Sequence, residues 1–374
     1  MTVLTIGSGH RDFRDFLNPK SRARIAAYGT LADRSYIIAF TRPGFKTQTL
    51  ENNVVVFPTN SRSRWLAPMH AMRLGKKVLA GILAGEPVVI SAQDPFESGV
   101  VAWLLRCRFP QARLQLQVHT DIFSPYFWRE RWENLFRVWL AKFLLPRADC
   151  IRAVSQRICR SFVSRGIDSG KITVLPVWSS PLDISPIARD KENLRVLVVS
   201  RLEREKGVGD SIIGFSDLIQ RGGKGHLTIV GDGGQRNKLG VLVEKLGVEK
   251  SVTFSGWQQD VAPYYAAADV LLSTALYEGW GLAAWDALQA GVPVVMTDVG
   301  LAGEVALHNV NGLIVPVGDT EQIGSALFRL SRDSQLLTRL GESSQLMRPA
   351  YSDYLDRYGI ALRSCLHRSP ESVL

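Results

Sequence analysis

The sequence predicts an α/β protein with two doubly wound, Rossmann-like domains, each built on a parallel sheet. Two observations carry this prediction. The chain of 374 residues is longer than one hydrophobic core can usually serve. Short β-rich runs also alternate with amphipathic segments of helical period along its length. Such alternation indicates parallel strands with helices on both faces of each sheet.

The expected elements fall into two halves around a polar segment with two prolines at 179–193. After a first strand in MTVLTI, the first half has strand-like runs at 35–40, 53–58, 86–93, 113–120, 149–155 and 171–177. The second half has them at 193–200, 226–232, 251–257, 269–274, 291–297 and 312–318, with helical patterns such as 210–223 and 320–333. We therefore expect a first domain at 1–182 and a second at 190–350.

Composition excludes several classes of protein. The chain is 46% hydrophobic and 21% charged, as in an ordinary globular protein. No apolar run approaches the roughly 18 residues of a membrane-spanning helix, and the start does not resemble a signal peptide. The four cysteines form no CxxC pair, which favours reduced thiols in a cytoplasm over a zinc site or a disulfide framework.

The positive charge is concentrated in the first half. Residues 1–190 hold 27 Lys and Arg against 14 Asp and Glu, whereas the remainder holds 18 against 21. The basic half is suited to an anionic partner such as nucleic acid, phospholipid headgroups or a phosphorylated substrate. A solvated basic surface without a partner is the alternative.

In doubly wound domains ligands bind at the carboxyl ends of the strands, so the residues after each strand are the candidates. Arg201 follows the strand at 193–200, and Lys206 stands five positions later, before Gly207 and a helix. Two cations beside a helix start are suited to a diphosphate. Ordinary surface cations would look the same.

A second candidate region contains two acids eight positions apart, Glu278 and Asp286. Between them, Gly279 and Gly281 allow a close approach of the backbone to a ligand, and a helix from about Leu282 would point free N–H groups at an anion. Another glycine loop begins at Gly231, where a tight turn without a ligand is the alternative.

An ordered set of motifs at 199–319 resembles the nucleotide-sugar-binding half of family 4 retaining glycosyltransferases, which have the GT-B fold. The motifs are SRLEREKG, IVGDGG, VTFSGW, LYEGWGLAAWDALQAGVPVV and NVNGLIVPVGD. The first half resembles the family more thinly, through QDP at 93–95, VHTD at 118–121 and ADCIRAVS at 148–155.

The resemblance implies a role for each motif residue. Arg201 and Lys206 would hold the donor diphosphate, and Glu278 would bond hydroxyls of the transferred sugar. Amides around Gly281 and Leu282 would contact the phosphate and the sugar.

The resemblance also implies that Asp286 takes the ribose hydroxyls and that His119 reaches the donor sugar. It implies an acceptor-binding first domain on which the helix at 352–367 packs. No cofactor or metal is expected, because the chain contains no Asp-x-Asp pair.

Three departures from the family pattern are visible. Asp286 replaces a glutamate and shortens that side chain by about 1.5 Å. The loop at 7–16 lacks adjacent glycines, and PVWSSP at 176–181 stands where relatives carry Pro-Asn-Gly. The acceptor side is therefore expected to be unusual.

The segment 125–147 combines aromatic and basic residues near helical spacing. Such a helix can lie on an anionic bilayer, and the alternative is a helix that packs in the core of the first domain. With the charge asymmetry, it favours a lipid-linked or membrane-proximal acceptor and a peripheral place at the inner face of the plasma membrane.

The sequence thus predicts a retaining glycosyltransferase that moves a sugar from a nucleotide-diphosphate sugar to a saccharide in bacterial envelope or exopolysaccharide biosynthesis. A nucleotide-sugar epimerase of similar fold and a non-catalytic binding or scaffold subunit are the rivals. Nucleic-acid binding is disfavoured, because the basic half shows no recognition motif.

Overall fold

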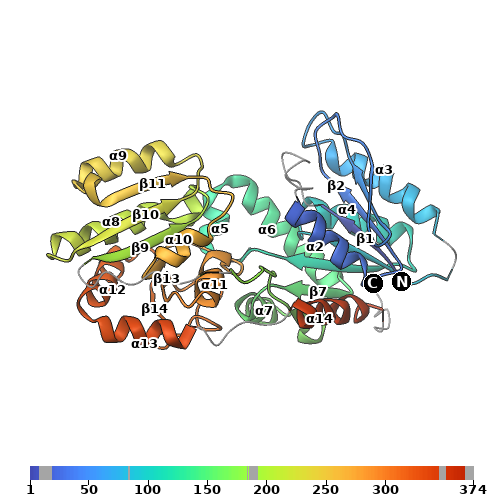
Figure 1. Cartoon of the computed structure of the whole chain (residues 1–374). Coiled ribbons are helices and arrows are strands. Elements are labelled where there is room, and N and C mark those ends of the chain that lie inside the picture. Colours follow the sequence, from blue (N-terminus) through green and yellow to red (C-terminus); the bar gives the residue numbers. More distant parts are fainter. Residues whose placement is uncertain (8–18, 83–84, 183, 185–192, 345–350, 367–374) are drawn as a thin grey trace. The chain divides into compact units, whose positions relative to one another are not determined.

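The computed structural model describes residues 1–7, 19–82, 85–182, 184, 193–344 and 351–366. The chain forms two compact units. The first comprises Met1–Phe123, Arg131–Pro176 and Ala350–Leu374, and the second comprises Ser124–Glu130 and Val177–Pro349. Each unit has one sheet with helices on both faces, so the predicted fold class is confirmed (Figure 1).

The first unit contains an eight-stranded sheet of order β3-β4-β2-β1-β5-β6-β7-β8, in which β3 alone of the described strands is antiparallel to its neighbour. Its strands are β1 (Thr2–Ile6), β2 (Arg34–Ala39), β3 (Gln48–Leu50), β4 (Val54–Pro58), β5 (Val88–Ala92), β6 (Arg113–Val118), β7 (Cys150–Ala153) and β8 (Ile172–Val174). Its helices are α2 (Pro19–Gly29), α3 (Ala67–Ala80), α4 (Glu97–Arg108), α6 (Trp132–Leu144), α7 (Gln156–Val163) and α14 (Tyr351–Arg363), with the short 3-10 helices η1 (Leu145–Arg147) and η2 (Ser169–Lys171).

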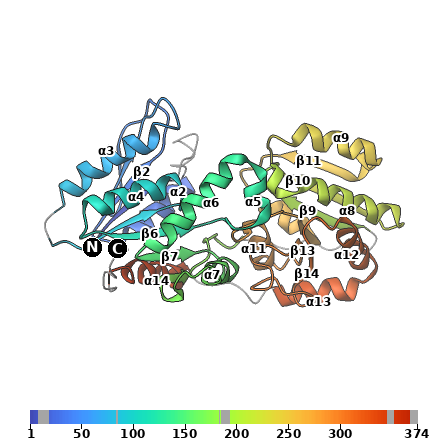
Figure 2. The ribbon, with the colours of Figure 1, turned by 180° about the vertical axis from the view of Figure 1, so that it is seen from behind.

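The helices of this unit form two layers. Crossovers through α3, α4 and α6 run in the same direction along the sheet, and the right-handed rule puts them on one face. Figure 2 shows these three helices over the same side of the strands. Tyr28 of α2 stacks at a tilt on Tyr358 of α14, with ring centroids 4.8 Å apart, so α2 and α14 lie together.

A buried arginine joins α14 to the sheet. Arg152 of β7 donates hydrogen bonds to Gln117 Oε1 of β6 (2.9 Å), to Tyr354 Oη of α14 (2.9 Å) and to the carbonyl of Pro176 (2.8 Å). Its guanidinium also lies 4.8 Å from the ring centroid of Tyr358, and Gln117 donates to the hydroxyl of that tyrosine. Because these groups are buried, each depends on its partners inside the protein.

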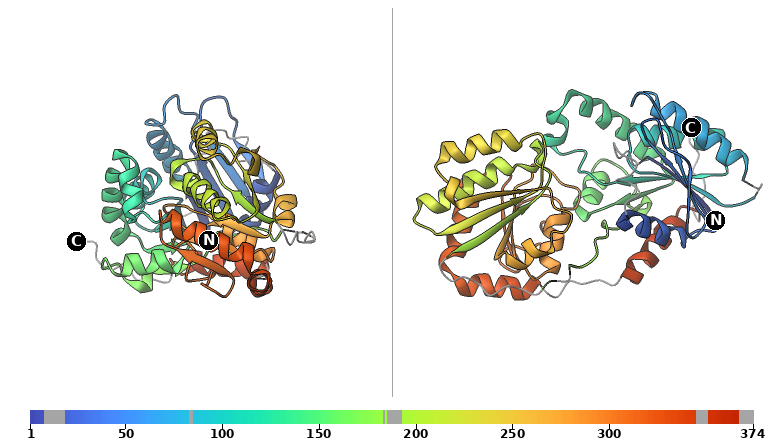
Figure 3. Two further views of the ribbon diagram at one scale, coloured as in Figure 1. Left: turned by 90° about the vertical axis from the view of Figure 1, so that its left-hand side faces the viewer. Right: turned by 45° about the horizontal axis from the view of Figure 1, so that its top comes forward.

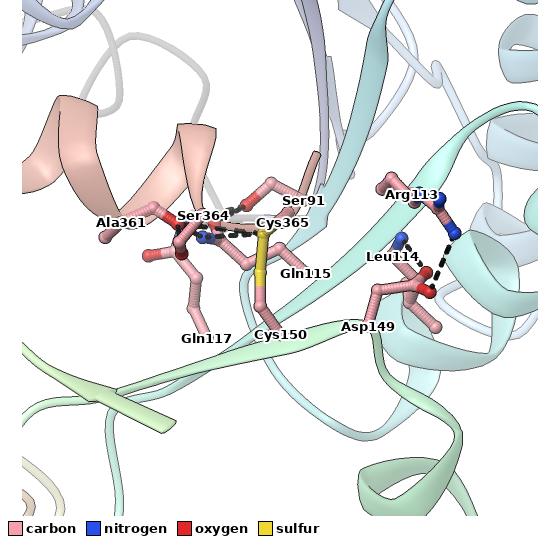
Figure 4. Close-up of a disulfide and its surroundings, with 10 residues drawn as sticks. All are labelled: Ser91, Arg113, Leu114, Gln115, Gln117, Asp149, Cys150, Ala361, Ser364 and Cys365. Atoms are coloured by element: carbon pink, nitrogen blue, oxygen red, sulfur yellow. Dashed lines mark hydrogen bonds and ion pairs between the residues drawn. A yellow bond between two sulfur atoms is a disulfide. The ribbon is translucent and has the colours of Figure 1, made fainter. Parts of the chain in front are cut away.

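A disulfide between Cys150 of β7 and Cys365, just after α14, makes a second link (Figure 4). The two Cα atoms are 5.3 Å apart. The expectation of four reduced thiols is therefore wrong for this pair, whereas Cys107 and Cys159 do not form disulfides. The pairing could not be predicted, because the two cysteines have a sequence separation of 215 and only the fold brings β7 and α14 together.

The second unit contains a six-stranded sheet of order β11-β10-β9-β12-β13-β14, visible in both views of Figure 3. The strands are β9 (Leu194–Val199), β10 (Gly225–Val230), β11 (Val252–Gly256), β12 (Val270–Ser273), β13 (Val294–Thr297) and β14 (Gly312–Val315). The helices are α5 (Pro125–Glu130), α8 (Val208–Gln220), α9 (Arg236–Leu246), α10 (Ala262–Ala267), α11 (Leu282–Gln289), α12 (Thr320–Arg332) and α13 (Ser334–Ser344), with η3 (Arg204–Lys206) and η4 (Glu249–Ser251).

The core of the second unit lies between its sheet and the layer of α8, α9 and α12. Gly214 of α8 has no room for a side chain, because an added Cβ would lie 2.3 Å from Cγ2 of Ile323 in α12. This contact brings the two helices close together over β9.

Two expectations need correction. The segment 125–147 is not one helix, because Arg131 adopts an extended backbone with φ −144° and ψ 144° and separates α5 from α6. The boundary between the units lies at Pro176 and not at residue 182, and α5 belongs to the second unit. Residues 8–16 of the glycine-poor loop and 185–192 of the polar linker lie outside the described residues.

Arg152→Met is expected to lower the free energy of unfolding by about 3 kcal/mol or more, since each buried acceptor left without a donor costs about 1–3 kcal/mol. Arg357→Met is the matched control, because Arg357 is an exposed residue of α14 that donates a long bond of 3.4 Å to the carbonyl of Val174. Urea unfolding measures both. Equal losses in the two variants would show that the Arg152 network does not secure α14.

Candidate functional site

The candidate site of the second unit lies where the direction of the sheet reverses. The strands β9, β10 and β11 extend to one side of the sheet, and β12, β13 and β14 extend to the other. Ligands of open parallel sheets bind at such a switch point, beyond the carboxyl ends of the strands. Here the two strands at the reversal are β9 and β12, which pair directly with each other.

An ion pair joins the loops that follow these two strands. Lys206 Nζ in η3, after β9, contacts Glu278 Oε1 in the loop after β12. Both side chains are mostly buried. The loops are also joined through their backbones, because the Leu276 amide donates to the carbonyl of Glu205 at 2.9 Å.

Gly207 allows this close approach. Its backbone is left-handed, with φ 60°, and an added Cβ would lie 2.1 Å from the carbonyl oxygen of Thr274. The Thr274 hydroxyl in turn donates to the carbonyl of Gly207 at 2.8 Å. The sequence Lys206-Gly207 is therefore required for the two loops to meet.

Arg201 presents a guanidinium beside this pair. It lies two residues after the end of β9, its side chain is exposed, and it donates to Glu205 Oε1 at 2.8 Å. A long exposed side chain on a rigid strand end can move toward a ligand at low cost, and guanidinium binds phosphate oxygens in a bidentate manner.

Gly231, at the end of β10, lies against the strand end of β9. An added Cβ would lie 1.8 Å from the Ser200 carbonyl oxygen, and φ is 135°. The Ser200 hydroxyl is buried without a hydrogen-bond partner within the described part of the chain. The glycine thus leaves backbone and a free hydroxyl at the strand ends.

The N-terminus of α11 adds backbone amides to the site. Gly281 caps the helix with φ 98°, and Leu282 follows as its first residue. The amide of Trp285 makes the first intrahelical bond, to the Gly281 carbonyl at 3.0 Å. The amides of residues 282–284 precede that bond and have no acceptor within the helix, so they can face an anion.

Asp286 lies on the second turn of α11 and accepts a hydrogen bond from the Ser179 hydroxyl. Burial raises the pKa of its carboxyl to about 6, and the Ser179 bond partly opposes that rise. The carboxylate is therefore ionised at neutral pH but becomes protonated in mild acid.

Several contacts beside Glu278 were not predicted from the sequence. The neighbouring Tyr277 donates its hydroxyl to Glu130 Oε2 and packs edge to face on Phe127, with ring centroids 5.6 Å apart. Both partners belong to α5, which also packs against η3. No sequence signal marks these contacts, because α5 is far along the chain from β12.

The predicted site residues of the second unit thus lie near the carboxyl ends of strands in one sheet. His119 belongs to the first unit, immediately after β6. Its Nε2 atom is buried without a hydrogen-bond partner in the described ranges. Burial, assisted by the charges of Arg152 and Arg24, lowers the pKa of His119 to about 3, so its imidazole is neutral at physiological pH.

No group of three or more His, Cys, Asp or Glu residues among the described positions is arranged to hold a metal ion.

Two family models match this chain. The model described as "Glycosyl transferases group 1" matches residues 180–347, and "Glycosyl transferase 4-like domain" matches residues 22–178. Together they cover most of the chain. The protein belongs to the group 1 glycosyltransferases of family 4, and it is an enzyme of that class.

Among curated relatives, the chain is 25% identical to the amylovoran biosynthesis glycosyltransferase AmsK of Erwinia amylovora, over 82% of this chain and 78% of that protein. It is 36% identical to the lipopolysaccharide core biosynthesis glycosyltransferase LpsE of Rhizobium meliloti, over 31% of this chain and 34% of that protein.

Solved structures confirm the GT-B fold. Sucrose-phosphate synthase from Thermosynechococcus elongatus matches with a TM-score of 0.76 and 21% identity, over 97% of both chains. Anabaena Alr3699/HepE in complex with UDP and glucose matches with a TM-score of 0.70 and 20% identity, again over 97% of both chains.

Asp286→Asn is expected to stabilise the protein relative to wild type above pH 6. The carboxyl has a pKa of 3.8 when exposed and about 6 when folded, so folding favours its protonated form. The contribution of this carboxyl to the free energy of unfolding is fully present below pH 3.8 and is lost as the pH rises through 6. One pKa unit corresponds to about 1.4 kcal/mol, so the gain is at most about 3 kcal/mol.

Thermal unfolding from acid to neutral pH measures this effect. Asp353→Asn, at an exposed position of α14, is the control and should follow the wild-type profile. An Asp286→Asn profile parallel to wild type at every pH would contradict the raised pKa.

Proposed function

We propose that this enzyme is a retaining glycosyltransferase that uses a nucleotide-diphosphate sugar as donor. The observation that carries the proposal is the Lys206–Glu278 pair at the switch point, flanked by Arg201 and the free amides of α11. Cations and helix amides are suited to a diphosphate, and a carboxylate beside them is suited to sugar hydroxyls.

In the proposed complex, the diphosphate lies between the Lys206 ammonium and the start of α11. Lys206 has three N–H donors, so it can retain Glu278 and still bind a phosphate oxygen. Glu278, positioned by that pair, accepts hydrogen bonds from the transferred sugar. Asp286 accepts hydrogen bonds from the ribose in place of the Ser179 hydroxyl, or together with it.

The reaction requires no nucleophile from the protein. The bond between the sugar C1 and the β-phosphate oxygen breaks, and its electron pair stays on the leaving diphosphate. An acceptor hydroxyl attacks C1 from the same face, and its proton passes to an oxygen of that diphosphate, so the configuration is retained. Arg201, Lys206 and the α11 amides stabilise the developing negative charge. Such electrostatic stabilisation of the transition state is usually the largest single contribution to catalysis.

In the proposal, His119 of the first unit also binds the donor sugar. A neutral imidazole can donate one hydrogen bond and accept another, and Nε2 lacks a partner within the described residues. It would bond the donor sugar without adding positive charge. We expect the first unit to hold the acceptor and the reaction to need no metal.

The names of three relatives support a proposal for the acceptor class. They refer to amylovoran biosynthesis, lipopolysaccharide core biosynthesis and poly(glycerol-phosphate), and the findings support a place in polysaccharide or lipopolysaccharide biosynthesis. We propose that this enzyme extends a lipid-linked saccharide of that kind. It would work in the cytoplasm at the inner face of the plasma membrane. No described helix is long and apolar enough to span a bilayer.

The donor site is tested by thermal unfolding with UDP, GDP, ADP and their sugars. One nucleotide diphosphate at 100 times its dissociation constant should stabilise the wild type by about 2.7 kcal/mol. Arg201→Ala and Lys206→Ala should lose most of that shift, whereas Arg204→Ala, an exposed residue of the same turn, should keep it. No shift with any nucleotide would reject the donor site and favour a scaffold role.

Glu278→Gln separates sugar recognition from phosphate recognition. We expect the variant to bind the nucleotide diphosphate within about threefold of wild type but its sugar at least about tenfold more weakly, since charged hydrogen bonds contribute about 1.5–3 kcal/mol. Titration calorimetry measures both ligands, with the exposed Glu244→Gln on α9 as control. Equal weakening for both ligands would assign Glu278 to the phosphates. Wild-type turnover of the donor without any acceptor would favour an epimerase.

A further inference from the structure

The outward face of α6 is almost entirely apolar. Trp132 and Trp139 are 75% and 60% exposed, and Leu135 and Phe136 are exposed between them. These positions are three or four residues apart, so their side chains project from one side of the helix. The opposite side, with Leu140 and Leu144, is buried, and α6 packs on α4. This face is additional to the packing side, so α6 both packs in the first unit and exposes apolar side chains.

The aromatic side chains on this face form a continuous stack. Phe136 stacks on Trp139 with centroids 5.9 Å apart, and Trp139 stacks on Phe143 at 6.2 Å. Trp103 of α4 meets Phe143 edge to face at 5.2 Å. The Arg147 guanidinium lies 3.8 Å from the Phe143 centroid. The stack holds these rings in place at the surface with a cation at one end.

The same surface continues to the start of α3. Arg64 lies 3.8 Å from Glu133 in the first turn of α6, and its guanidinium stands 4.6 Å from the Trp65 centroid. Trp65 is 69% exposed, and Met69 is exposed on α3. The helix between them, α4, exposes Leu104. Because α3 packs on α4 and α4 packs on α6, these side chains belong to one helix layer (Figure 2).

Cations surround the apolar side chains. Residues 62–80 contain five Lys or Arg and no Asp or Glu. On α3, Arg73, Lys76 and Lys77 are exposed, and on α6 so is Lys142. The acids of α4 and α6, Glu97 and Glu133, are paired with Arg137 and Arg64. The surface charge of this layer is therefore strongly positive.

We infer that the aromatic-basic face, formed by residues 62–77, Leu104 and the exposed side of α6, binds an anionic lipid bilayer. Indole rings favour the headgroup region, where their apolar body and N–H group are both satisfied. Lys and Arg beside them are attracted to the negative charge of anionic lipid. A helix with this distribution lies in the plane of the interface.

Charge favours a bilayer over a second copy of the chain. A symmetric dimer through this face would bring together two identical sets of cations, which repel each other. An anionic bilayer supplies the complementary charge and an apolar layer of adaptable shape. The inference rests on the proposed function for its purpose, because the face would bring the enzyme to a lipid-linked acceptor. Its physical test does not depend on catalysis.

The experiment is flotation with vesicles of phosphatidylcholine, with and without phosphatidylglycerol, at low and high salt. Wild type should bind the phosphatidylglycerol vesicles and dissociate as salt screens the cations. Trp132→Ser with Phe136→Ser and Trp139→Ser should lower binding at least about tenfold, and Arg73→Gln with Lys76→Gln and Lys77→Gln should remove most of the dependence on phosphatidylglycerol.

Two controls keep the result interpretable. Val241→Ser with Ile360→Ser removes exposed apolar side chains elsewhere, on α9 and α14, and should bind vesicles like wild type. The nucleotide-induced thermal shift should persist in every variant, which shows that each is folded and tests the donor site separately.

Failure of wild type to float at low salt with phosphatidylglycerol would overturn the inference, even if the nucleotide shift is present. Equal loss in the control double variant would also overturn it. Concentration-dependent dimers that disappear in the triple serine variant, without vesicle binding, would assign the face to a second copy instead.

Discussion

The contact between the loops after β9 and β12 is the constraint on which the candidate site depends. The two strands are neighbours in the sheet, although Lys206 and Glu278 are 72 residues apart in the chain. Direct strand pairing fixes where each loop begins. Gly207 then lets the two backbones touch, and the ion pair gives both side chains a defined position. Loops fixed in this way at the carboxyl ends of rigid strands hold their ligand-binding side chains in more accurate positions than a free loop would.

The first unit depends on a different interaction. Arg152 is buried in β7, and it supplies donors to two neighbouring elements and to the chain that leaves β8. The same charge helps to keep His119 neutral, so one residue influences both packing and the chemistry of the strand end. The disulfide from the adjacent Cys150 adds a covalent link to the end of α14.

Much of the fold and of the second-unit site could be predicted from the sequence, because strands with helices between them and residues after strands follow local rules. Arg201, Lys206 and Glu278 were selected in this way, and the structure pairs Lys206 with Glu278. Four features could not be predicted. The Ser179–Asp286 bond and the Cys150–Cys365 pair join segments distant in sequence. The break between α5 and α6 at Arg131 contains no proline or glycine that would have predicted it. The spacing of the aromatic residues also does not show which side of α6 faces solvent.

The position of α5 has a consequence for how the two halves of such enzymes can be exchanged. Residues 124–130 come from the first half of the sequence, but Phe127 and Glu130 pack on Tyr277, beside Glu278. A chimera that joined the first half of another protein to residues 177–349 would replace these two partners with foreign ones. The modular border of the donor-side unit is therefore discontinuous in sequence. Recombination at a single crossover point would separate Tyr277 from the side chains that support it.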